Sequence, residues 1–449
     1  MNEKEVLFRD APIPRAVGRM ALPCVVSSLV LIVYNMADTF FVGQTKDALQ
    51  VAAVSLTNPV FVMFMAIANL LGIGGSAMIS ILMGKGEEKK VKAVSAFCCY
   101  GSLGVGVICA AVILLFMDPL LNILGSSQGT YGFARDYLLW IGLGAPFILF
   151  ANTFGHVVRG EGAASVSMIG GMIGTVANII LDPIFILTFD MGTAGAAIAT
   201  VLGNVFGCLY YLWYFSRGKS ILSLRPGYMA GEGRLIAQTA VLGVPSGMNS
   251  ALMSIANVLQ NNVLVAYGDD QLAAMGIVTK IYMLVAFIHM GIANGIQPLL
   301  GYSYGGGLRR RFQGIMKFSA LTTVICGTVL TVFCIVLRHP IMKLFIDDAA
   351  VISYGMDMLV ATCLAGPVLG ILFLCINGMQ ALDDPVPSTI LSVCRQGLLF
   401  IPLLYLLNAA FGLEGVIYTQ TAADYLSIVI SLFLLRHSMK KLQEVNFTH

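Results

Sequence analysis

Charged side chains are scarce in this sequence. Asp, Glu, Lys and Arg make up 11% of the 449 residues, whereas an ordinary soluble domain contains about 25%. Hydrophobic types account for 58%, and the mean hydropathy is +0.86. So few charges cannot cover the surface of a soluble protein of this size, because apolar surface in water costs about 25 cal/mol per Å². The composition therefore excludes a soluble protein and makes lipid the solvent for most of the chain.

The chain also lacks the motifs of several protein classes. None of the ten cysteines forms a Cys-x-x-Cys pair, which argues against a zinc knuckle or a dithiol redox centre. No Gly-x-x-x-x-Gly-Lys-Ser/Thr motif is present to bind ATP, and no His-Glu-x-x-His sequence occurs among the five scattered histidines. The net charge is only +3, and no basic tract of nucleic-acid type interrupts the chain. We therefore expect neither an enzyme, nor a cofactor, nor a nucleic-acid partner.

Long apolar runs recur along the whole chain. A spanning helix needs about 20 apolar residues, and hydropathy predicts twelve such segments. In the first half they lie near residues 16–43, 51–83, 93–117, 134–158, 165–190 and 192–216, and in the second half near 235–267, 272–304, 314–337, 354–381, 388–410 and 412–435. The first run is longer than the core of a signal peptide and is expected to be retained. The predicted fold class is an all-α integral membrane protein with twelve transmembrane helices.

The Lys and Arg residues between these segments are distributed unevenly. If the N-terminus is cytoplasmic, twenty lie on the cytoplasmic side and two lie within spans, Lys280 and Arg395. Four lie on the opposite side: Lys46, Arg135, Arg338 and Lys343. Because cytoplasmic loops carry the excess of basic residues, we expect a multi-pass protein with both termini in the cytoplasm.

The two halves of the sequence repeat one another at a nearly constant distance. Pro23 and Pro245 lie 222 residues apart in the first spans of the two halves, and Pro183 and Pro402 lie 219 apart in the fifth spans. Six spans per half is an even number, so both halves enter the membrane from the same side and are related by a parallel pseudo-two-fold axis along the membrane normal. Such lobes enclose a cavity that opens alternately to either face. The prediction is an N-lobe (1–216), a cytoplasmic interlobe loop (217–234) and a C-lobe (235–449).

Two acidic residues of the first half lie inside apolar spans. Asp38 follows an apolar stretch of the first span, and Asp182 precedes Pro183 in the fifth span. A charge at mid-bilayer costs about 2.5–3.5 kcal/mol on insertion scales, so each one needs a reason. Asn178 and Asp182 are four residues apart and share one helix face, and Pro183 offers no N–H to the preceding turn. With Thr200 of the sixth span, these groups predict an oxygen-rich site for a cation or a proton. The alternative is a proline kink with one structurally satisfied aspartate.

The second half carries different charges within its spans. Lys280, Arg395 and Asp424 lie in the eighth, eleventh and twelfth spans, and the positions that the repeat sets opposite Asp38 and Asp182 are neutral. Two interpretations are open for Lys280, Arg395 and Asp424: the basic residues form a structural ion pair with Asp424 or with Asp357, or these residues form a polar network that is coupled to transport. The first-half carboxylates would resist being ionised together in a low dielectric. Such a pair can hold a proton or an alkali cation and release it when an organic cation arrives.

Two stretches of the sequence resemble the signatures of one transporter family. Tyr34–Gly43 (YNMADTFFVG) is similar to the first-helix signature of the multidrug and toxic compound extrusion (MATE) family. Arg159–Gly162 (RGEG), followed by Asn178–Pro183 (NIILDP), resembles the family's signature for the fourth and fifth helices. The resemblance covers nearly the whole chain and includes the two six-helix halves. It implies secondary active export of organic cations and other amphipathic compounds in exchange for protons or sodium, by alternating access.

The resemblance also assigns roles to individual residues. It implies an ion-coupling site of Asp38, Asn178, Asp182 and Thr200, with any coupling sodium ion held by the first three. Met253 stands where the NorM-like branch has a glutamate, which favours the DinF-like or MepA-like branch. We expect contacts with the substrate from three residues, Tyr34, Asn35 and Asn152. The implied location is the bacterial cytoplasmic (inner) membrane, and we expect a monomer.

A lipid-linked precursor flippase is the alternative function, because related flippases share a similar two-lobed fold. A flippase of this kind needs several cationic residues in its cavity to bind pyrophosphate, whereas only Lys280 and Arg395 lie within spans here. A channel is a further alternative, but the unequal halves favour alternating access over a continuous pore. The sequence therefore favours export of organic cations.

Overall fold

The computed structural model describes residues 3–44, 47–218 and 220–440, and the side chains of all of these except residues 3, 4, 35, 38–40, 43 and 48. These residues are helical almost throughout and include no β-strand. The predicted all-α fold is therefore confirmed.

The helices follow the predicted spans closely. The first half of the chain forms α1 (Glu3–Arg9), α2 (Ile13–Gly43), α3 (Ala48–Gly84), α4 (Glu88–Leu115), α5 (Met117–Ile123), α6 (Tyr131–Gly160), α7 (Ala164–Pro183), η1 (Ile184–Thr188) and α8 (Gly192–Ser216). The second half forms η2 (Pro226–Met229), α9 (Gly233–Val265), α10 (Asp269–Gly305), α11 (Arg309–Val336), α12 (Arg338–Phe345), α13 (Ala349–Cys363), α14 (Gly366–Ala381), α15 (Pro385–Val393), η3 (Cys394–Leu399), α16 (Phe400–Phe411) and α17 (Leu413–Ser438). Within the described residues, each of the twelve predicted spans coincides with one long helix or with consecutive helical segments.

Ten helical segments of the described residues are long and apolar enough to cross a membrane. The number rises to eleven when α13 and α14, which meet at a 45° bend, count as one span. The remaining predicted span is α9, which has the necessary length at 33 residues. Amide and hydroxyl side chains such as Gln238, Ser246 and Asn249 interrupt its apolar sequence and lower its hydropathy. The chain is thus a multi-pass membrane protein.

The chain divides into two compact units. The first unit comprises Val26–Gly243, and the second comprises the described residues of Val244–His449 together with those of Met1–Val25. The division falls inside two helices, α2 and α9, close to Pro23 and Pro245, which the sequence repeat sets opposite each other. The units differ from the predicted lobes at the first 25 residues and at the segment that precedes position 244. The lobe boundaries themselves stay a prediction.

The N-terminal segment shows why the first residues pack with the second unit. The guanidinium of Arg311, near the start of α11, donates to the carbonyl oxygens of Phe8 at 2.6 Å, Ala11 at 2.8 Å and Leu7 at 3.0 Å. These carbonyls lie at or just beyond the end of α1, where helical N–H partners run out and positive charge is favoured. The ring of Phe8 also stacks on Tyr302 of α10, with centroids 5.0 Å apart. One half-buried guanidinium thus anchors the N-terminal segment to the second half of the chain.

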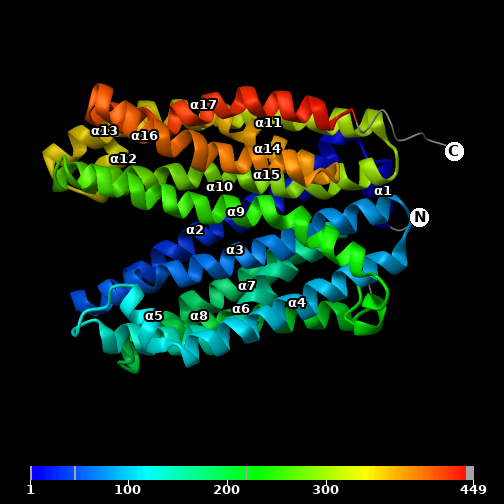
Figure 1. Ribbon diagram of the computed structural model, residues 1–449, viewed down its shortest axis with the longest axis horizontal. Helices are drawn as coiled ribbons and strands as arrows, with labels where there is room; N and C mark the ends of the chain where they lie inside the picture. Colours follow the sequence, from blue (N-terminus) through cyan, green and yellow to red (C-terminus); the bar gives the residue numbers. More distant parts are fainter. Residues whose placement is uncertain (1–2, 45–46, 219, 441–449) are drawn as a thin grey trace. The chain divides into compact units, whose positions relative to one another are not determined.

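In the first unit, α6 is the central helix and contacts α3, α4, α7 and α8. These helices run roughly parallel to one another and are coloured from blue to green in Figure 1. The core around α3 and α6 includes Phe64, Leu138 and Leu149, which are fully buried. Helices α7 and α8 also contact each other, and this pair carries most of the predicted site residues.

In the second unit, α10, α11 and α14 contact one another, and α17 contacts both α14 and α16. These helices are coloured from green to red in Figure 1. Its core includes Met358, Leu359 and Phe400. The eleventh predicted span consists of α15, η3 and α16, and all three segments pack against α17. The π-helical segment η3 therefore interrupts the span where it faces the last helix.

Candidate functional site

Helices α7 and α8 lie close together in the first unit because glycines face each other at their crossing. A Cβ atom at Gly203 of α8 would lie 2.5 Å from the carbonyl oxygen of Gly174 on α7 and 3.3 Å from the Cβ of Asn178. No residue larger than glycine fits at position 203 unless a helix moves. The short separation brings Asn178, one turn beyond Gly174, opposite Thr200, about one turn before Gly203.

Three of the predicted site residues meet between these helices. Asn178, Asp182 and Thr200 are 2%, 0% and 3% exposed, so they lie in the interior of the unit. In the orientation that satisfies both ends of its amide, Asn178 donates to Asp182 Oδ2 at 2.9 Å and accepts from Thr200 Oγ1 at 3.2 Å. The structure therefore brings these three residues together, and their role in ion coupling stays a prediction.

The fifth span changes its helical geometry directly after this cluster. Pro183 ends α7 and is followed by η1, in which the N–H of Phe189 donates to the carbonyl oxygen of Ile184 at 2.9 Å. Proline offers no N–H to the preceding turn, and short π-helical segments occur frequently at functional sites. The dipeptide Asp182-Pro183 thus places a buried carboxylate beside irregular backbone, as in membrane ion sites that are built on discontinuous helices.

Further polar groups continue from Thr200 toward α2 and α6. The Tyr34 hydroxyl lies 3.4 Å from Thr200 Oγ1. One turn along α8, the Asn204 amide donates to the Thr200 carbonyl oxygen at 2.8 Å, and Asn152 of α6 donates to Asn204 Oδ1 at 3.3 Å. Tyr34, Asn152 and Asn204 are half-buried. The polar groups therefore extend from the fully buried carboxylate to side chains that are accessible from outside the unit.

Two predicted residues lie outside the described side chains. Asn35 and Asp38 belong to α2, the helix that also carries Tyr34, but the structure does not describe their side chains. Positions 34 and 38 are one helical turn apart. The expectation that Asp38 forms a coupled pair with Asp182, and that Asn35 contacts the substrate, stays a prediction from the sequence.

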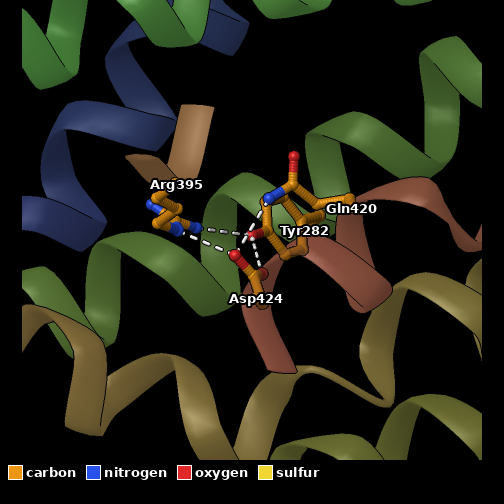
Figure 2. Close-up of polar contacts among 4 residues, drawn as sticks. All are labelled: Tyr282, Arg395, Gln420 and Asp424. Atoms are coloured by element: carbon orange, nitrogen blue, oxygen red, sulfur yellow. Dashed lines mark hydrogen bonds and ion pairs between the residues drawn. The ribbon is translucent and has the colours of Figure 1, made fainter. Parts of the chain in front are cut away.

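The second unit has a buried ionic cluster between α10, η3 and α17 (Figure 2). Arg395 Nε donates to Asp424 Oδ1 at 2.7 Å, and the Gln420 amide donates to the same oxygen at 3.0 Å. The Tyr282 hydroxyl donates to Asp424 Oδ2 at 3.2 Å and accepts from Arg395 Nη2 at 3.1 Å. The structure thus joins two residues of the predicted C-lobe network. The third, Lys280, is exposed on α10, and its ammonium makes no ion pair within the described part of the chain.

The signature stretch after α6 contains a buried acid with an unforeseen set of partners. Glu161 is fully buried, and its Oε1 accepts from the Tyr214 hydroxyl at 2.6 Å. Its Oε2 accepts from the Ser220 hydroxyl at 2.9 Å and from the Ile221 N–H at 3.2 Å. These contacts hold the end of α8 and the following loop against the turn between α6 and α7. The sequence feature that could have indicated this buried acid is its position between two glycines, Gly160 and Gly162.

The buried carboxylates of Asp182 and Asp424 have different surroundings. Asp182 Oδ2 accepts from the neutral Asn178 amide at 2.9 Å, and the oxygen of that amide accepts in turn from Thr200 Oγ1 at 3.2 Å. Asp424 already has a guanidinium partner, which stays charged in proteins. An ionised carboxylate is costly at this depth unless a cation, a proton or donors neutralise it. Asp182 therefore contacts a neutral amide, whereas the countercharge of Asp424 is a fixed guanidinium.

Comparison with known proteins identifies the family. The MatE family model matches residues 23–184 and again residues 245–406, so both halves of the predicted repeat match the same model. A protein of Staphylococcus saprophyticus named multidrug export protein MepA is 31% identical over 97% of this chain and 97% of its own length. A protein of the same name from Staphylococcus aureus (strain MRSA252) is 30% identical over 97% of this chain and 96% of its own length.

Solved structures share the fold. A crystal structure of a MATE protein in complex with MaL6 has a TM-score of 0.94 at 23% identity and covers 99% of this chain and 100% of that chain. A MOP superfamily transporter from Pyrococcus furiosus has a TM-score of 0.91 at 24% identity and covers 99% of both chains. The curated relatives carry the name of one of the two branches that Met253 favours. Since two matches of the family model together cover most of the sequence, this chain belongs to the MatE, or multidrug and toxic compound extrusion, family.

Proposed function

We propose that the chain is a secondary active multidrug exporter that exchanges organic cations or amphipathic compounds for protons or sodium ions by alternating access. The observation that carries the proposal is the buried cluster of Asn178, Asp182 and Thr200 inside membrane-spanning helices. Relatives at about 30% identity are named multidrug export proteins, which supports the same substrate class. The exporter needs no cofactor in this proposal, because its energy comes from the ion gradient.

Asp182 is the ion-binding carboxylate of the proposed mechanism. Asn178 donates to Asp182 and is held in turn by Thr200, and Asp38 of α2 is the proposed second carboxylate. Two carboxylates in a low-dielectric site do not ionise together readily, so the site takes up a proton or a sodium ion on one side of the membrane and gives it up on the other. Each charge that crosses the membrane supplies about 2.3 kcal/mol per 100 mV.

The cargo is proposed to bind next to the polar groups that continue from this site. Tyr34 and Asn152 are half-buried, and Asn35 joins them in the sequence-based proposal. A tyrosine ring attracts organic cations through its π face. Because the Tyr34 hydroxyl lies 3.4 Å from Thr200 Oγ1, a cargo that moves this ring also disturbs the residue that contacts Asn178. Cargo and coupling ion can therefore influence one another through a single hydroxyl.

A lipid-linked precursor flippase fits these observations less well. Recognition of pyrophosphate needs several available cationic groups. Of the two basic residues within the spans predicted from the sequence, Arg395 is engaged by Asp424 at 2.7 Å, which leaves the exposed Lys280. One available cation does not make a pyrophosphate site.

The chain contains one serine motif that is typical of hydrolases, but its structure does not support an enzymatic role. Residues 125–129 read Gly-Ser-Ser-Gln-Gly, which has the Gly-x-Ser-x-Gly form of a hydrolase nucleophile. That motif requires a strand-to-helix elbow, whereas Ser127 lies in the loop before α6 and its hydroxyl pairs with Thr130 Oγ1 at 3.1 Å. The serine therefore serves to close a turn.

The proposed placement of the exporter is the bacterial cytoplasmic membrane, as a monomer with both termini in the cytoplasm. The uneven distribution of basic residues supports this orientation, because twenty of the 26 Lys and Arg residues fall on the N-terminal side of the membrane. The orientation is tested with single cysteines introduced near each end of the chain. In intact cells, reaction of either cysteine with a membrane-impermeant thiol reagent would contradict the orientation.

Flux in proteoliposomes tests the function, with proton and sodium gradients imposed separately. We expect Asp182→Asn and Asp38→Asn to lose gradient-driven flux of a fluorescent organic cation, because each removes an exchangeable charge. Asp136→Asn changes an exposed carboxylate near the start of α6 in the same unit and serves as the matched control, with transport like the wild type. Gradient-driven flux at the normal rate in both site variants would remove these residues from the mechanism.

A further inference from the structure

The fifth and sixth spans of both halves carry a buried polar cluster, but the clusters differ in charge. In the first unit the cluster consists of Asn178 and Asp182 of α7 with Thr200 of α8. In the second unit it contains Arg395 of η3 and Asp424 of α17. Helices α7 and α8 contain no Lys or Arg, so the basic residue at position 395 distinguishes the second cluster.

The sequence repeat shows that the two clusters occupy corresponding places. Gly195 and Gly415 open the two sixth spans, 220 residues apart, and the same offset sets Gln420 opposite Thr200 and Asp424 opposite Asn204. The second carboxylate therefore lies on the sixth span of its half, whereas Asp182 lies on the fifth. Gln420 donates to the buried carboxylate of the second cluster at 3.0 Å. Both fifth spans also contain a π-helical segment near the cluster: η1 directly follows Asp182-Pro183, and η3 includes Arg395, although the repeat sets η1 opposite residues 403–407 of α16 and not opposite η3. The second cluster therefore lies between the same pair of spans as the proposed ion site, with its carboxylate on the other helix of the pair.

The guanidinium neutralises the second carboxylate from close range. Arg395 and Asp424 are 1% and 0% exposed, and Nε lies 2.7 Å from Oδ1. The guanidinium also lies over the ring of Phe373, with Cζ 5.3 Å from the centroid. Arginine is not deprotonated in proteins. The countercharge of Asp424 therefore belongs to the chain itself and cannot dissociate.

Stability alone gives a poor reason for this ion pair. Arg395 Nη1 is buried and has no hydrogen-bond partner among the described residues, so the cluster leaves part of the guanidinium unsatisfied. Buried ion pairs are often no more stabilising than apolar residues of similar size. A function for the fixed charge explains its presence better.

We propose that Arg395 is a built-in counter-cation, which occupies at Asp424 the place that a proton or a sodium ion takes at the corresponding site of the first unit. Asp424 then exchanges no ion during the transport cycle, and the first unit alone carries the coupling ion. The part about the first unit rests on the proposed function. The part about Asp424 does not, because it concerns ion binding in the second unit and is tested without transport.

The structure also says what removal of the guanidinium would create. Without Arg395, the Asp424 carboxylate and the Tyr282 hydroxyl, which both contact the guanidinium now, would face the vacated space. These oxygens would form a site for a proton or an alkali cation. We therefore expect the melting temperature of Arg395→Gln to depend on sodium and on pH through Asp424, which it does not do in the wild type.

The experiment compares melting temperatures of the purified full-length chain in detergent, in sodium chloride and in choline chloride of equal concentration, from pH 6 to pH 9. The variants are Arg395→Gln, Arg395→Lys and the double variant Arg395→Gln with Asp424→Asn, and Lys280→Gln serves as the matched control for loss of an exposed cation. Other ionisable groups on the elements that pack against α17 are Tyr354, Asp357, Cys363, Cys375, Cys394 and Tyr405. They are common to all variants, so the difference between the single and the double variant reports Asp424.

We expect Arg395→Gln to melt several degrees below the wild type in choline chloride at high pH, with the loss reversed by sodium or by lower pH. The double variant should melt near the wild type in both salts, because the two charges are removed together, and Arg395→Lys should retain most of the stability. Sodium and pH effects that are absent from Arg395→Gln, or equally large in the double variant, would overturn the proposal.

The double variant also decides the matter if Arg395→Gln does not fold. We expect it to keep gradient-driven flux with the ion dependence of the wild type, since its two charges never exchange. Loss of flux in a double variant that melts like the wild type would show that the pair takes part in ion exchange, and melting far below the wild type would show that the pair serves stability. Either result would overturn the proposal, whereas failure of the proposed function appears separately, as unchanged flux in Asp182→Asn.

Discussion

Substitution of Gly203 by alanine tests whether the close crossing of α7 and α8 builds the cluster around Asp182. The added Cβ would lie 2.5 Å from the carbonyl oxygen of Gly174, whereas ordinary contact begins at 3.4 Å. The neighbouring atom is backbone, so the helices themselves must separate, by about 0.9 Å at this point. The contact of 3.2 Å between Asn178 and Thr200 would then lengthen to roughly 4 Å, which is beyond hydrogen-bonding range.

The expected loss of stability follows from three contributions. Overpacking of a close-packed interior costs about 1–3 kcal/mol, and a buried polar group that loses its hydrogen bond costs about 1–3 kcal/mol. Replacement of a helical glycine by alanine offsets about 0.5–1 kcal/mol of this. We therefore expect Gly203→Ala to lose about 1–5 kcal/mol of unfolding free energy, and to lose gradient-driven flux because Thr200 no longer positions Asn178.

The control lies on the neighbouring helix. A Cβ at Gly171 of α7 meets no atom within 4 Å, so Gly171→Ala should melt at or slightly above the wild-type temperature and transport normally. Thermal unfolding in detergent and flux in proteoliposomes are measured for both variants. If Gly203→Ala unfolds and transports like Gly171→Ala, the glycine crossing does not assemble the site and the reasoning is refuted.

Two contacts outside the site give further predictions. Arg311→Ala removes three hydrogen bonds to the end of α1, so amide hydrogen exchange in α1 should become faster, whereas the neighbouring Arg310→Ala should leave it unchanged; equal exchange in both would contradict the anchoring. Tyr214→Phe deletes the 2.6 Å hydrogen bond to the buried Glu161 and should lower the unfolding free energy by about 1.5–3 kcal/mol, as for bonds to charged groups. Thermal unfolding measures this loss against Tyr210→Phe on the same helix, and equal melting of the two variants would refute it.

The candidate site was only partly readable from the sequence. The spacing of Asn178 and Asp182 places them on one helix face whatever the rest of the fold does, so their proximity could be predicted. Tyr282 lies 142 residues from Asp424, and Tyr214 lies 53 residues from Glu161. No local periodicity relates residues so far apart. Their pairing depends on which helices pack together, and hydropathy carries little information about that.

The sequence by itself determined the class of fold and its helical segments. In lipid, each backbone N–H and C=O must find its partner within the segment, so an apolar run of sufficient length has to be helical. For this reason all twelve predicted spans are helical in the described chain, including α9 with its amide side chains. The repeated prolines likewise identified the two halves, since a repeat needs only the order of residues to be recognised.

Only the tertiary structure decided which polar groups meet. The sequence did not show whether Lys280 or Arg395 pairs with Asp424. The packing of η3 against α17 makes Arg395 the partner. In the same way, two glycines allow α7 and α8 to approach until Thr200 reaches Asn178. The physical reason is range: helix formation depends on neighbours within one turn, whereas the contacts of a buried charge depend on the shapes of side chains on distant segments.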